Sequence, residues 1–463
     1  MARALCWLSG PVVFLLLRFL VPDTSAPANQ VVVLGTVAWM FLWWLFEVIP
    51  LAVTALLPLI MFPAFNVAST KSVASAYGAE VIFLFLGGFL LARAIEKWGV
   101  HHLLAQRMIG SRSYSVPATL LLFIGLTAFL SMWISNTAAA LVVLPLISSV
   151  SLNQQQHSQK LQRALKLGVA YAASIGGVAT LIGSPPNAIM ASISQERLGV
   201  QIGFLDWMLF GVPMMIVGCA AVWLYLAFLA CRIPNEHRAF SSHSTAGPSK
   251  TTSSQRRVLV VFLAAVLAWI GQGFLSIPFL SDAAIAMIAS IVLFSLPSGE
   301  PSKEPLLTKE DLVFGGWPVL LLFGGGLALS LGMDQSGLGQ TLADSLGGLS
   351  TLSPFLVVAC LTAALILLTE FSSNTAVAAI FVPLALSIAP AVGLSSLTAM
   401  MTVTMAGSLS FMLPMATPPN AVVFASGGLT VREMMKYGLG LNIVFWILIS
   451  LMVWLWLPIV WQM

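Results

Sequence analysis

Long apolar segments separated by short polar loops run along almost the whole 463-residue chain. A helix that crosses the hydrocarbon core of a bilayer needs about 20 mostly apolar residues. We predict eleven transmembrane helices, near 5–21, 31–46, 48–66, 80–96, 165–193, 205–230, 257–275, 279–296, 312–333, 394–425 and 437–461. Two more apolar segments, 116–150 and 352–390, are too long for one straight crossing at about 1.5 Å per residue. Each must bend back or cross twice, and we predict a re-entrant hairpin in each.

The composition agrees with this pattern. Hydrophobic residues make up 59% of the chain and charged residues only 8%, whereas soluble proteins carry about 25% charged residues. The chain is therefore predicted to be an all-α integral membrane protein in contact with the lipid bilayer. A net charge of +4 without a basic stripe argues against nucleic-acid binding. No nucleophile or metal-ligand cluster stands out, so we expect neither an enzyme nor a cofactor.

Lys and Arg predict the orientation, because positive residues concentrate in cytoplasmic loops. With a cytoplasmic N-terminus, only Lys71 and Arg197 fall in outside loops. The C-terminus is then periplasmic or extracellular, in a protein of the cytoplasmic (inner) membrane. Arg3, the short apolar run after it and the small residues at 25–28 also fit a cleavable signal peptide. Both interpretations place Gln30 outside.

Three motifs occur twice, in the same order and at nearly the same offset. SMWISNTAAALVVLPL at 131–146 returns as TEFSSNTAVAAIFVPL at 369–384, displaced by 238 residues. GSPPNA at 183–188 returns as ATPPNA after 233 residues, and LFLGG at 84–88 returns as LLFGG after 237. The chain is therefore divided into a first helix (1–30), repeat 1 (31–232), a polar cytoplasmic linker (233–256) and repeat 2 (257–463).

Each repeat contains three spans, a hairpin, a broken helix (165–193 or 394–425) and a last span (205–230 or 437–461). Because five crossings are an odd number, the second repeat enters from the opposite face of the membrane. An inverted-topology repeat of this kind is common among secondary transporters.

The duplicated motifs place polar groups inside apolar segments. Each Ser-Asn-Thr motif indicates a break in the helix, and such a break is tolerated at membrane depth only inside protein or along a wet cavity. The paired prolines that follow Ser184 and Thr417 remove two amide donors each and should unwind their spans. We expect Asn187 and Asn420 to cap the helices that resume.

Hydroxyls, amides and carbonyls are oxygen ligands for a hard cation, and the scarcity of carboxylates favours a monovalent ion such as sodium. Helix starts after the breaks suit an anion with one or two carboxylates. No Lys or Arg lies at either motif, so bound cations must share in neutralising that anion. Glu370, beside the second motif, is either a proton or cation site or a structural residue.

These doubled motifs resemble the divalent anion/sodium symporter family, which carries dicarboxylates, citrate or sulfate. The resemblance covers essentially the whole chain. It implies a homodimer in which a fixed scaffold supports a transport domain that contains both hairpins and both unwound helices. It also implies that this domain moves across the membrane as an elevator.

The resemblance also implies the binding residues. Sodium site 1 would use Ser131, Ser135, Asn136 and the carbonyl of Gly183, and sodium site 2 would use Thr369, Ser372, Asn374 and Ala416, with backbone carbonyls at Ser372 and Ala416. The substrate carboxylates would meet Asn136, Thr137, Ser184, Ser373, Asn374, Thr375, Thr417 and Pro418.

The leading hypothesis is therefore a sodium-coupled symporter of four-carbon dicarboxylates such as succinate, fumarate and malate. One alternative is a sodium-independent dicarboxylate or citrate exchanger on the same scaffold. Another is a sodium/proton or arsenite-type antiporter, in which Glu370 would titrate.

Overall fold

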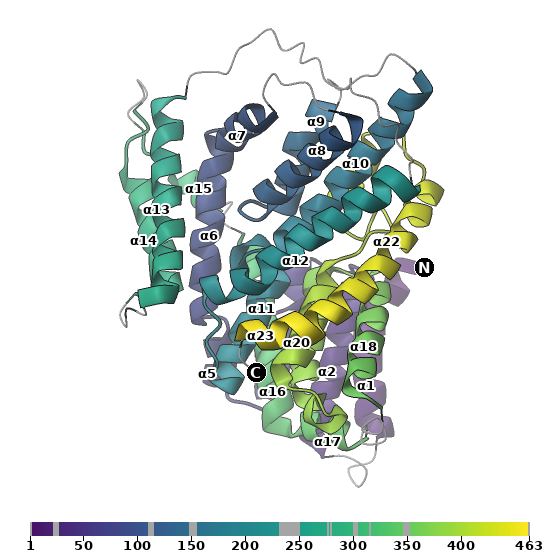
Figure 1. Ribbon diagram of the computed structural model, residues 1–463. Helices are drawn as coiled ribbons and strands as arrows, with labels where there is room; N and C mark the ends of the chain where they lie inside the picture. Colours follow the sequence, from purple (N-terminus) through teal and green to yellow (C-terminus); the bar gives the residue numbers. More distant parts are fainter. Residues whose placement is uncertain are drawn as a thin grey trace.

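The structure, a computed structural model, describes residues 2–21, 27–109, 115–147, 155–230, 251–275, 277, 280–299, 304–313, 316–345 and 352–461. Helices form almost all of this part of the chain (Figure 1). The described residues contain no strand, and their single β-bridge joins Pro297 and Pro305. Most of the expected linker at 233–256 lies outside the described residues.

The described residues of the first half form twelve α-helices and three short helical segments of other types. They are α1 (Ala2–Leu20), α2 (Ala28–Leu45), α3 (Leu51–Thr54), α4 (Leu57–Ala64), α5 (Thr70–Ala76), α6 (Glu80–Lys97), α7 (Val100–Ile109), α8 (Val116–Ser131), α9 (Asn136–Ile147), α10 (Gln155–Gly177), η1 (Leu181–Gly183), α11 (Pro185–Ile193), η2 (Ser194–Leu198), α12 (Phe204–Leu224) and η3 (Tyr225–Ala230).

The second half repeats much of this order. Its helices are α13 (Ser253–Leu275), α14 (Asp282–Ser295), α15 (Lys309–Val313), α16 (Trp317–Ser336), α17 (Leu338–Ser345), α18 (Pro354–Thr369), α19 (Asn374–Ile388), η5 (Pro390–Val392), α20 (Ser396–Ser408), α21 (Pro418–Ala425), α22 (Val431–Leu451), η6 (Met452–Trp456) and α23 (Leu457–Trp461). Figure 1 places α8 and α9 in the upper half of the molecule and α18 in the lower half.

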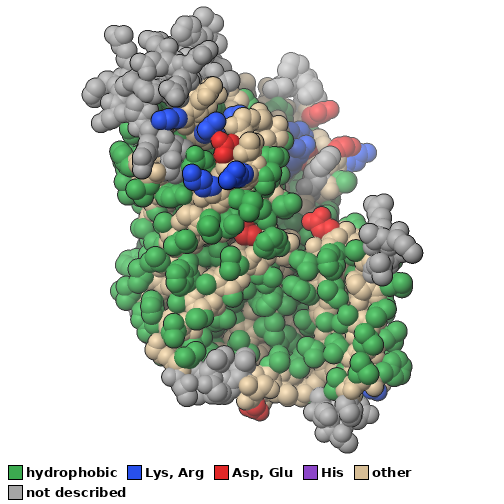
Figure 2. All heavy atoms as spheres, turned by 90° about the vertical axis from the view of Figure 1, so that its right-hand side faces the viewer, with side chains coloured by type: hydrophobic (Ala, Val, Ile, Leu, Met, Phe, Trp, Pro, Cys, Tyr) green, Lys and Arg blue, Asp and Glu red, His purple; other side chains and the backbone are tan. Residues whose placement is uncertain are grey.

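The surface is that of a multi-pass membrane protein. Six helical segments of the described chain are long and apolar enough to cross a bilayer, at 28–45, 70–97, 204–229, 253–275, 309–336 and 431–461. Large apolar side chains such as Phe19, Leu229 and Phe274 are 70–80% exposed. Figure 2 shows hydrophobic side chains over a broad band of this face and most of its Lys and Arg near one end. Lipid would cover such a band.

The span expected at 48–66 is not one continuous helix. Residues 48–66 form two short helices, α3 and α4, which are separated by Ala55 and Leu56. Pro58 occupies the first turn of α4. Because proline has no amide proton, Pro58 cannot bond back to the preceding turn, and the helix restarts there.

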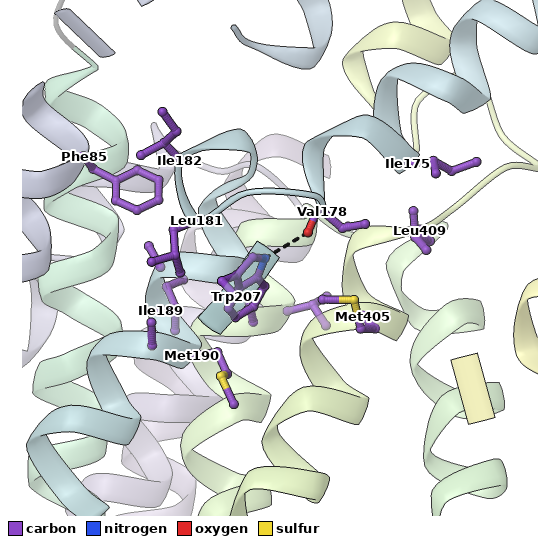
Figure 3. Close-up of a cluster of buried hydrophobic side chains, with 14 of the residues drawn as sticks. Phe85, Ile175, Val178, Leu181, Ile182, Ile189, Met190, Trp207, Met405 and Leu409 are labelled. Carbon is purple, nitrogen blue, oxygen red and sulfur yellow. Dashed lines mark hydrogen bonds between the residues drawn. The ribbon is translucent and has the colours of Figure 1, made fainter. Parts of the chain in front are cut away.

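The broken helices are buried in the centre of the molecule. Trp207 of α12 is fully buried, and its Nε1 donates a hydrogen bond to the carbonyl of Val178, 2.9 Å away, in the segment between α10 and α11 (Figure 3). Gly176 lies near the end of α10, where an added Cβ would come within 2.3 Å of the Ala128 carbonyl oxygen of α8. Helices α8 and α10 therefore touch backbone to backbone, as small residues permit in membrane proteins.

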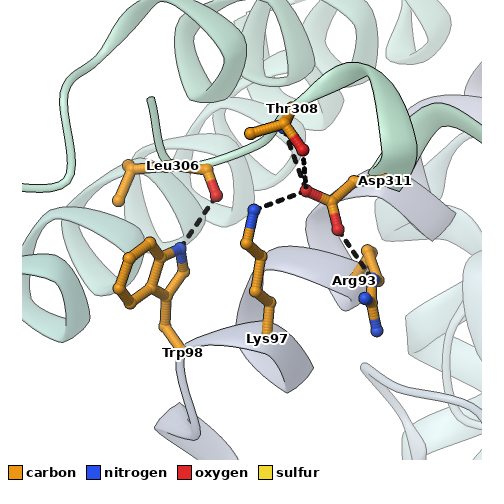
Figure 4. Close-up of polar contacts among 6 residues, drawn as sticks. All are labelled: Arg93, Lys97, Trp98, Leu306, Thr308 and Asp311. Atoms are coloured by element: carbon orange, nitrogen blue, oxygen red, sulfur yellow. Dashed lines mark hydrogen bonds and ion pairs between the residues drawn. The ribbon is translucent and has the colours of Figure 1, made fainter. Parts of the chain in front are cut away.

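An ion-pair cluster joins α6 to α15, more than 200 residues apart in sequence (Figure 4). Arg93 Nε and Lys97 Nζ contact the two carboxylate oxygens of Asp311 at 3.0 and 2.6 Å. The Asp311 side chain is 4% exposed, and it also accepts a hydrogen bond from the backbone amide of Thr308. This carboxylate thus fixes α15, in the second half of the chain, against the end of α6.

We predict that Asp311→Ala destabilises the protein by about 2 kcal/mol, because it removes a buried carboxylate that accepts charge-assisted hydrogen bonds. Arg93 and Lys97, which lose this carboxylate, are partly exposed to water, and this exposure limits the loss of stability. Glu310→Ala is the matched control, since that neighbouring side chain is 65% exposed. Thermal unfolding of the detergent-solubilised protein should show a lower midpoint for the Asp311 variant alone. Equal midpoints for both variants would contradict this role.

Candidate functional site

Each Ser-Asn-Thr motif lies at the turn between two helices. Helix α8 ends at Ser131 and α9 begins at Asn136, while α18 ends at Thr369 and α19 begins at Asn374. The expected breaks are therefore present at both motifs, and each asparagine opens a new helix. Backbone amides in the first turn of a helix have no partner within it and carry partial positive charge.

The Pro-Pro-Asn motifs also start helices after a break. Helix α10 ends at Gly177 and α11 resumes at Pro185; α20 ends at Ser408 and α21 resumes at Pro418. In both cases the two prolines occupy the first two positions of the new helix, where a missing amide proton costs no hydrogen bond. This placement explains why an unwound segment is followed by regular helix.

The expectation that Asn187 and Asn420 cap these helices is wrong. The N-cap residues are Ser184 and Thr417, and Thr417 Oγ1 accepts the hydrogen bond from the backbone amide of Asn420. Each asparagine lies inside the new helix and points back across the break. It therefore fastens the unwound segment instead of capping.

The hydrogen bonds of the two asparagines correspond position by position. Asn187 Nδ2 donates to the carbonyls of Gly177 and Thr180 at 2.9 and 2.8 Å. Asn420 Nδ2 donates to those of Ser410 and Leu413 at 3.4 and 3.1 Å. The Oδ1 atoms of both asparagines are buried and have no hydrogen-bond partner within the described part of the chain. Each break thus contains a buried amide oxygen with a free acceptor site.

A cluster of three oxygens lies beside each Ser-Asn-Thr turn. Ser131 Oγ is 2.8 Å from Asn136 Oδ1 and 2.6 Å from the Ala173 carbonyl oxygen. Thr369 Oγ1 is 2.7 Å from Asn374 Oδ1 and 2.9 Å from the Gly407 carbonyl oxygen. A hydroxyl has only one proton to donate. Each cluster therefore has unused lone pairs, an arrangement that suits a small hard cation.

Both halves of the molecule line one cavity of about 760 Å³. All eight residues expected to bind substrate contribute to its wall: Asn136, Thr137, Ser184, Ser373, Asn374, Thr375, Thr417 and Pro418. Four more from the expected sodium sites do so as well: Ser135, Gly183, Ser372 and Ala416. Ser131 and Thr369 are fully buried and contact the wall through Asn136 and Asn374.

The cavity is electrostatically unusual. Among the described residues that line it, none is Lys, Arg or His, and Glu47 is the one ionisable side chain. The positive potential comes instead from the starts of α9, α11, α19 and α21, which all contribute wall residues. The sequence motifs did not predict that Glu47, Trp44 and Trp133 would also line this cavity. The only signal for Glu47 was a lone carboxylate in an apolar region.

Glu370 does not line the cavity. Its buried carboxylate accepts hydrogen bonds from the backbone amides of 411, 412 and 413 and from Asn442 Nδ2, at 2.8–3.1 Å. It thereby holds the segment between α20 and α21. Met132 is the counterpart in the first half, where its carbonyl accepts a hydrogen bond from Thr180 Oγ1 at 2.7 Å. This geometry favours the structural interpretation of Glu370.

The sequence matches the family described as "Sodium:sulfate symporter transmembrane region" over residues 3–462. The chain belongs to this family. The match confirms the resemblance to divalent anion/sodium symporters that the doubled motifs indicated, and the family consists of transporters.

Two relatives share the name "Sodium-dependent dicarboxylate transporter SdcS" and are 36% identical to this chain. They come from Staphylococcus saprophyticus and from Staphylococcus aureus strain USA300, and each alignment covers 97% of this chain and 90% of the relative. The solved structure of the Alcanivorax borkumensis YdaH transporter is similar with a TM-score of 0.62, over 84% of this chain and 88% of that one. At 15% identity it shows a common fold.

We predict that Gly177→Ala disturbs the first Ser-Asn-Thr turn of this family member. An added Cβ would lie 2.6 Å from Asn136 Oδ1, so the asparagine must move. The expected loss of stability is about 1–3 kcal/mol, as for other overpacked sites. Gly125→Ala is the control, because nothing lies within 4 Å of its Cβ position. Thermal unfolding measures both, and a Gly177 variant as stable as the control would contradict the tight contact.

Proposed function

We propose that the protein is a sodium-coupled symporter of four-carbon dicarboxylates such as succinate, fumarate and malate, located in the cytoplasmic membrane. The names of the relatives support the substrate and the ion. The observation that carries the proposal is one cavity lined by both polar turns and by four helix starts, with no cationic side chain among the described residues of its wall. Such a site holds a dianion well only together with bound cations.

Two sodium sites would flank the substrate. Site 1 uses Ser131, Ser135, Asn136 and the carbonyl of Gly183, and site 2 uses Thr369, Ser372, Asn374 and Ala416. In each, the buried hydroxyl already lies within 3 Å of the asparagine Oδ1, and it also contacts a carbonyl oxygen of the neighbouring helix, that of Ala173 or Gly407. Sodium would bind to the unused lone pairs of these oxygens.

The substrate would place one carboxylate at each Ser-Asn-Thr turn. Asn136 and Thr137 would receive one, and Asn374 and Thr375 the other, with Ser184, Ser373, Thr417 and Pro418 completing the wall. Two sodium charges balance a dianion, and coupling follows because either partner alone leaves an uncompensated charge in a site of low polarity.

The transport cycle would be an elevator movement in a homodimer. Helix α21 contacts both α9 and α10, and α18 contacts α20, so both hairpins and both broken helices pack together. The placement of α8 and α18 in opposite halves of the molecule supports an inverted repeat (Figure 1). With a cytoplasmic N-terminus, the α8–α9 hairpin would enter from the inside and the α18–α19 hairpin from the outside.

Uptake of radiolabelled succinate into proteoliposomes tests the proposal. We expect an inward sodium gradient to drive accumulation, because sodium completes the anion site. Vesicles with equal choline in place of sodium are the control. Uptake that does not depend on sodium but requires dicarboxylate inside the vesicles would instead identify an exchanger and refute the sodium coupling.

The two buried hydroxyls give a sharper prediction. Ser131→Ala and Thr369→Ala should each raise the half-saturating sodium concentration about tenfold, since each removes one oxygen ligand. The succinate KM at saturating sodium should change much less, because neither hydroxyl lines the cavity.

Thr369→Ser should restore the sodium affinity by restoring the hydroxyl. The matched control is Thr362→Ala on the same helix, whose hydroxyl bonds only within α18 to the Val358 carbonyl. Sodium titrations of uptake measure all four variants. Unchanged sodium dependence in both alanine variants would remove the cation assignment.

A further inference from the structure

The turn that follows helix α2 contains a residue with an unusual backbone conformation. The Phe46 amide donates to the Leu42 carbonyl at 3.0 Å and the Val48 amide to the Trp43 carbonyl at 3.1 Å, a C-terminal closure that places the next residue in the left-handed region. That residue is Glu47, with a φ of 45°. Glycine is strongly preferred at this position because a Cβ is strained there.

The charge of Glu47 is also unfavourable for the helix. A carboxylate at a helix C-terminus faces the negative end of the helix dipole. Glu47 is exposed, and its carboxylate has neither a hydrogen-bond donor nor a cation as partner in the described ranges. The local structure therefore gains nothing from this side chain, and strained residues of this kind often serve function.

The position of Glu47 indicates what that function is. Glu47 lines the same cavity as Asn136 and Asn374, next to Trp44, Phe46 and Leu51 from its own segment. It brings the cavity a negative charge that no wall residue of the described chain offsets. A carboxylate there attracts cations and repels an incoming dianion, and both effects are greatest when the sodium sites are empty.

We propose that Glu47 enforces the order of binding, sodium before anion, by repelling the dicarboxylate until cations occupy the cavity. This inference rests on the proposed sodium-coupled dicarboxylate transport. Without sodium, the dianion meets one fixed negative charge and no compensating ion. With two sodium ions bound, the site has a positive charge that outweighs Glu47, and the anion enters.

Succinate binding to the purified full-length protein, measured by titration calorimetry at several sodium concentrations and constant ionic strength, tests this role. Glu47→Gln keeps the size and the strained backbone but removes the charge. We expect it to tighten succinate binding measured without sodium by about threefold to tenfold. At saturating sodium the succinate affinity should change much less, so the dependence of succinate affinity on sodium should become weaker. Glu47→Asp should behave like the wild type, as should the distant control Glu310→Gln.

The variant Glu47→Gly separates the effect of the side-chain charge from that of the backbone conformation. It should shift the sodium dependence as Glu47→Gln does, yet raise the thermal midpoint, because glycine relieves the left-handed strain. Sodium titrations of Glu47→Gln and Glu47→Gly that superimpose on the wild type would overturn the inference. A shifted sodium dependence in Glu47→Gly together with an unchanged one in Glu47→Gln would also overturn it, because that result would assign the effect to the backbone. If wild-type protein shows no sodium-dependent succinate binding, the proposed function itself fails.

Discussion

Backbone that leaves helical geometry in apolar surroundings must find new partners for its amides and carbonyls, and the centre of this protein is built on that requirement. Four helices are interrupted where the two halves of the chain meet. Asn187 and Asn420 satisfy carbonyls freed at the ends of α10 and α20. The helix starts that follow the interruptions contribute residues to the wall of one cavity, and the buried hydroxyls of Ser131 and Thr369 contact that wall through Asn136 and Asn374. The interruption of the helices thus supplies the ligands.

In the proposed mechanism, bound ions are part of the binding site because the described wall of that cavity contains no cationic side chain. A Lys or Arg would hold an anion permanently and independently of sodium. Helix starts provide a weaker and more diffuse potential, which leaves room for coupling. Glu47 strengthens this dependence on ions, because its negative charge further weakens the binding of an anion when no cation is bound. Affinity for the acid is therefore conditional on the ion.

Much of the candidate site was predictable from sequence because its signals are strong and local. Paired prolines cannot continue a helix, and the duplication of both motifs predicted that Asn136 and Asn374 would share one site. The residues that line the cavity include every one expected to contact substrate. Long apolar helices were predicted for the same reason, since their length alone identifies them.

Other features depend on contacts between distant segments or on backbone angles, which residue patterns do not reveal. The bonding of Glu370 to the amides of 411–413 required the path of the unwound segment. The left-handed conformation of Glu47 and its place in the cavity wall required the turn after α2. The interruption at Ala55 was also missed, although Pro58 was its local signal.

The most direct measurement is an experimental structure of the protein with sodium and succinate bound, at a resolution that distinguishes ions from water. We predict one dicarboxylate between Asn136 and Asn374, with a cation beside Ser131 and another beside Thr369. Succinate bound elsewhere, or held in this cavity by a Lys or Arg side chain with no cation near either turn, would contradict it.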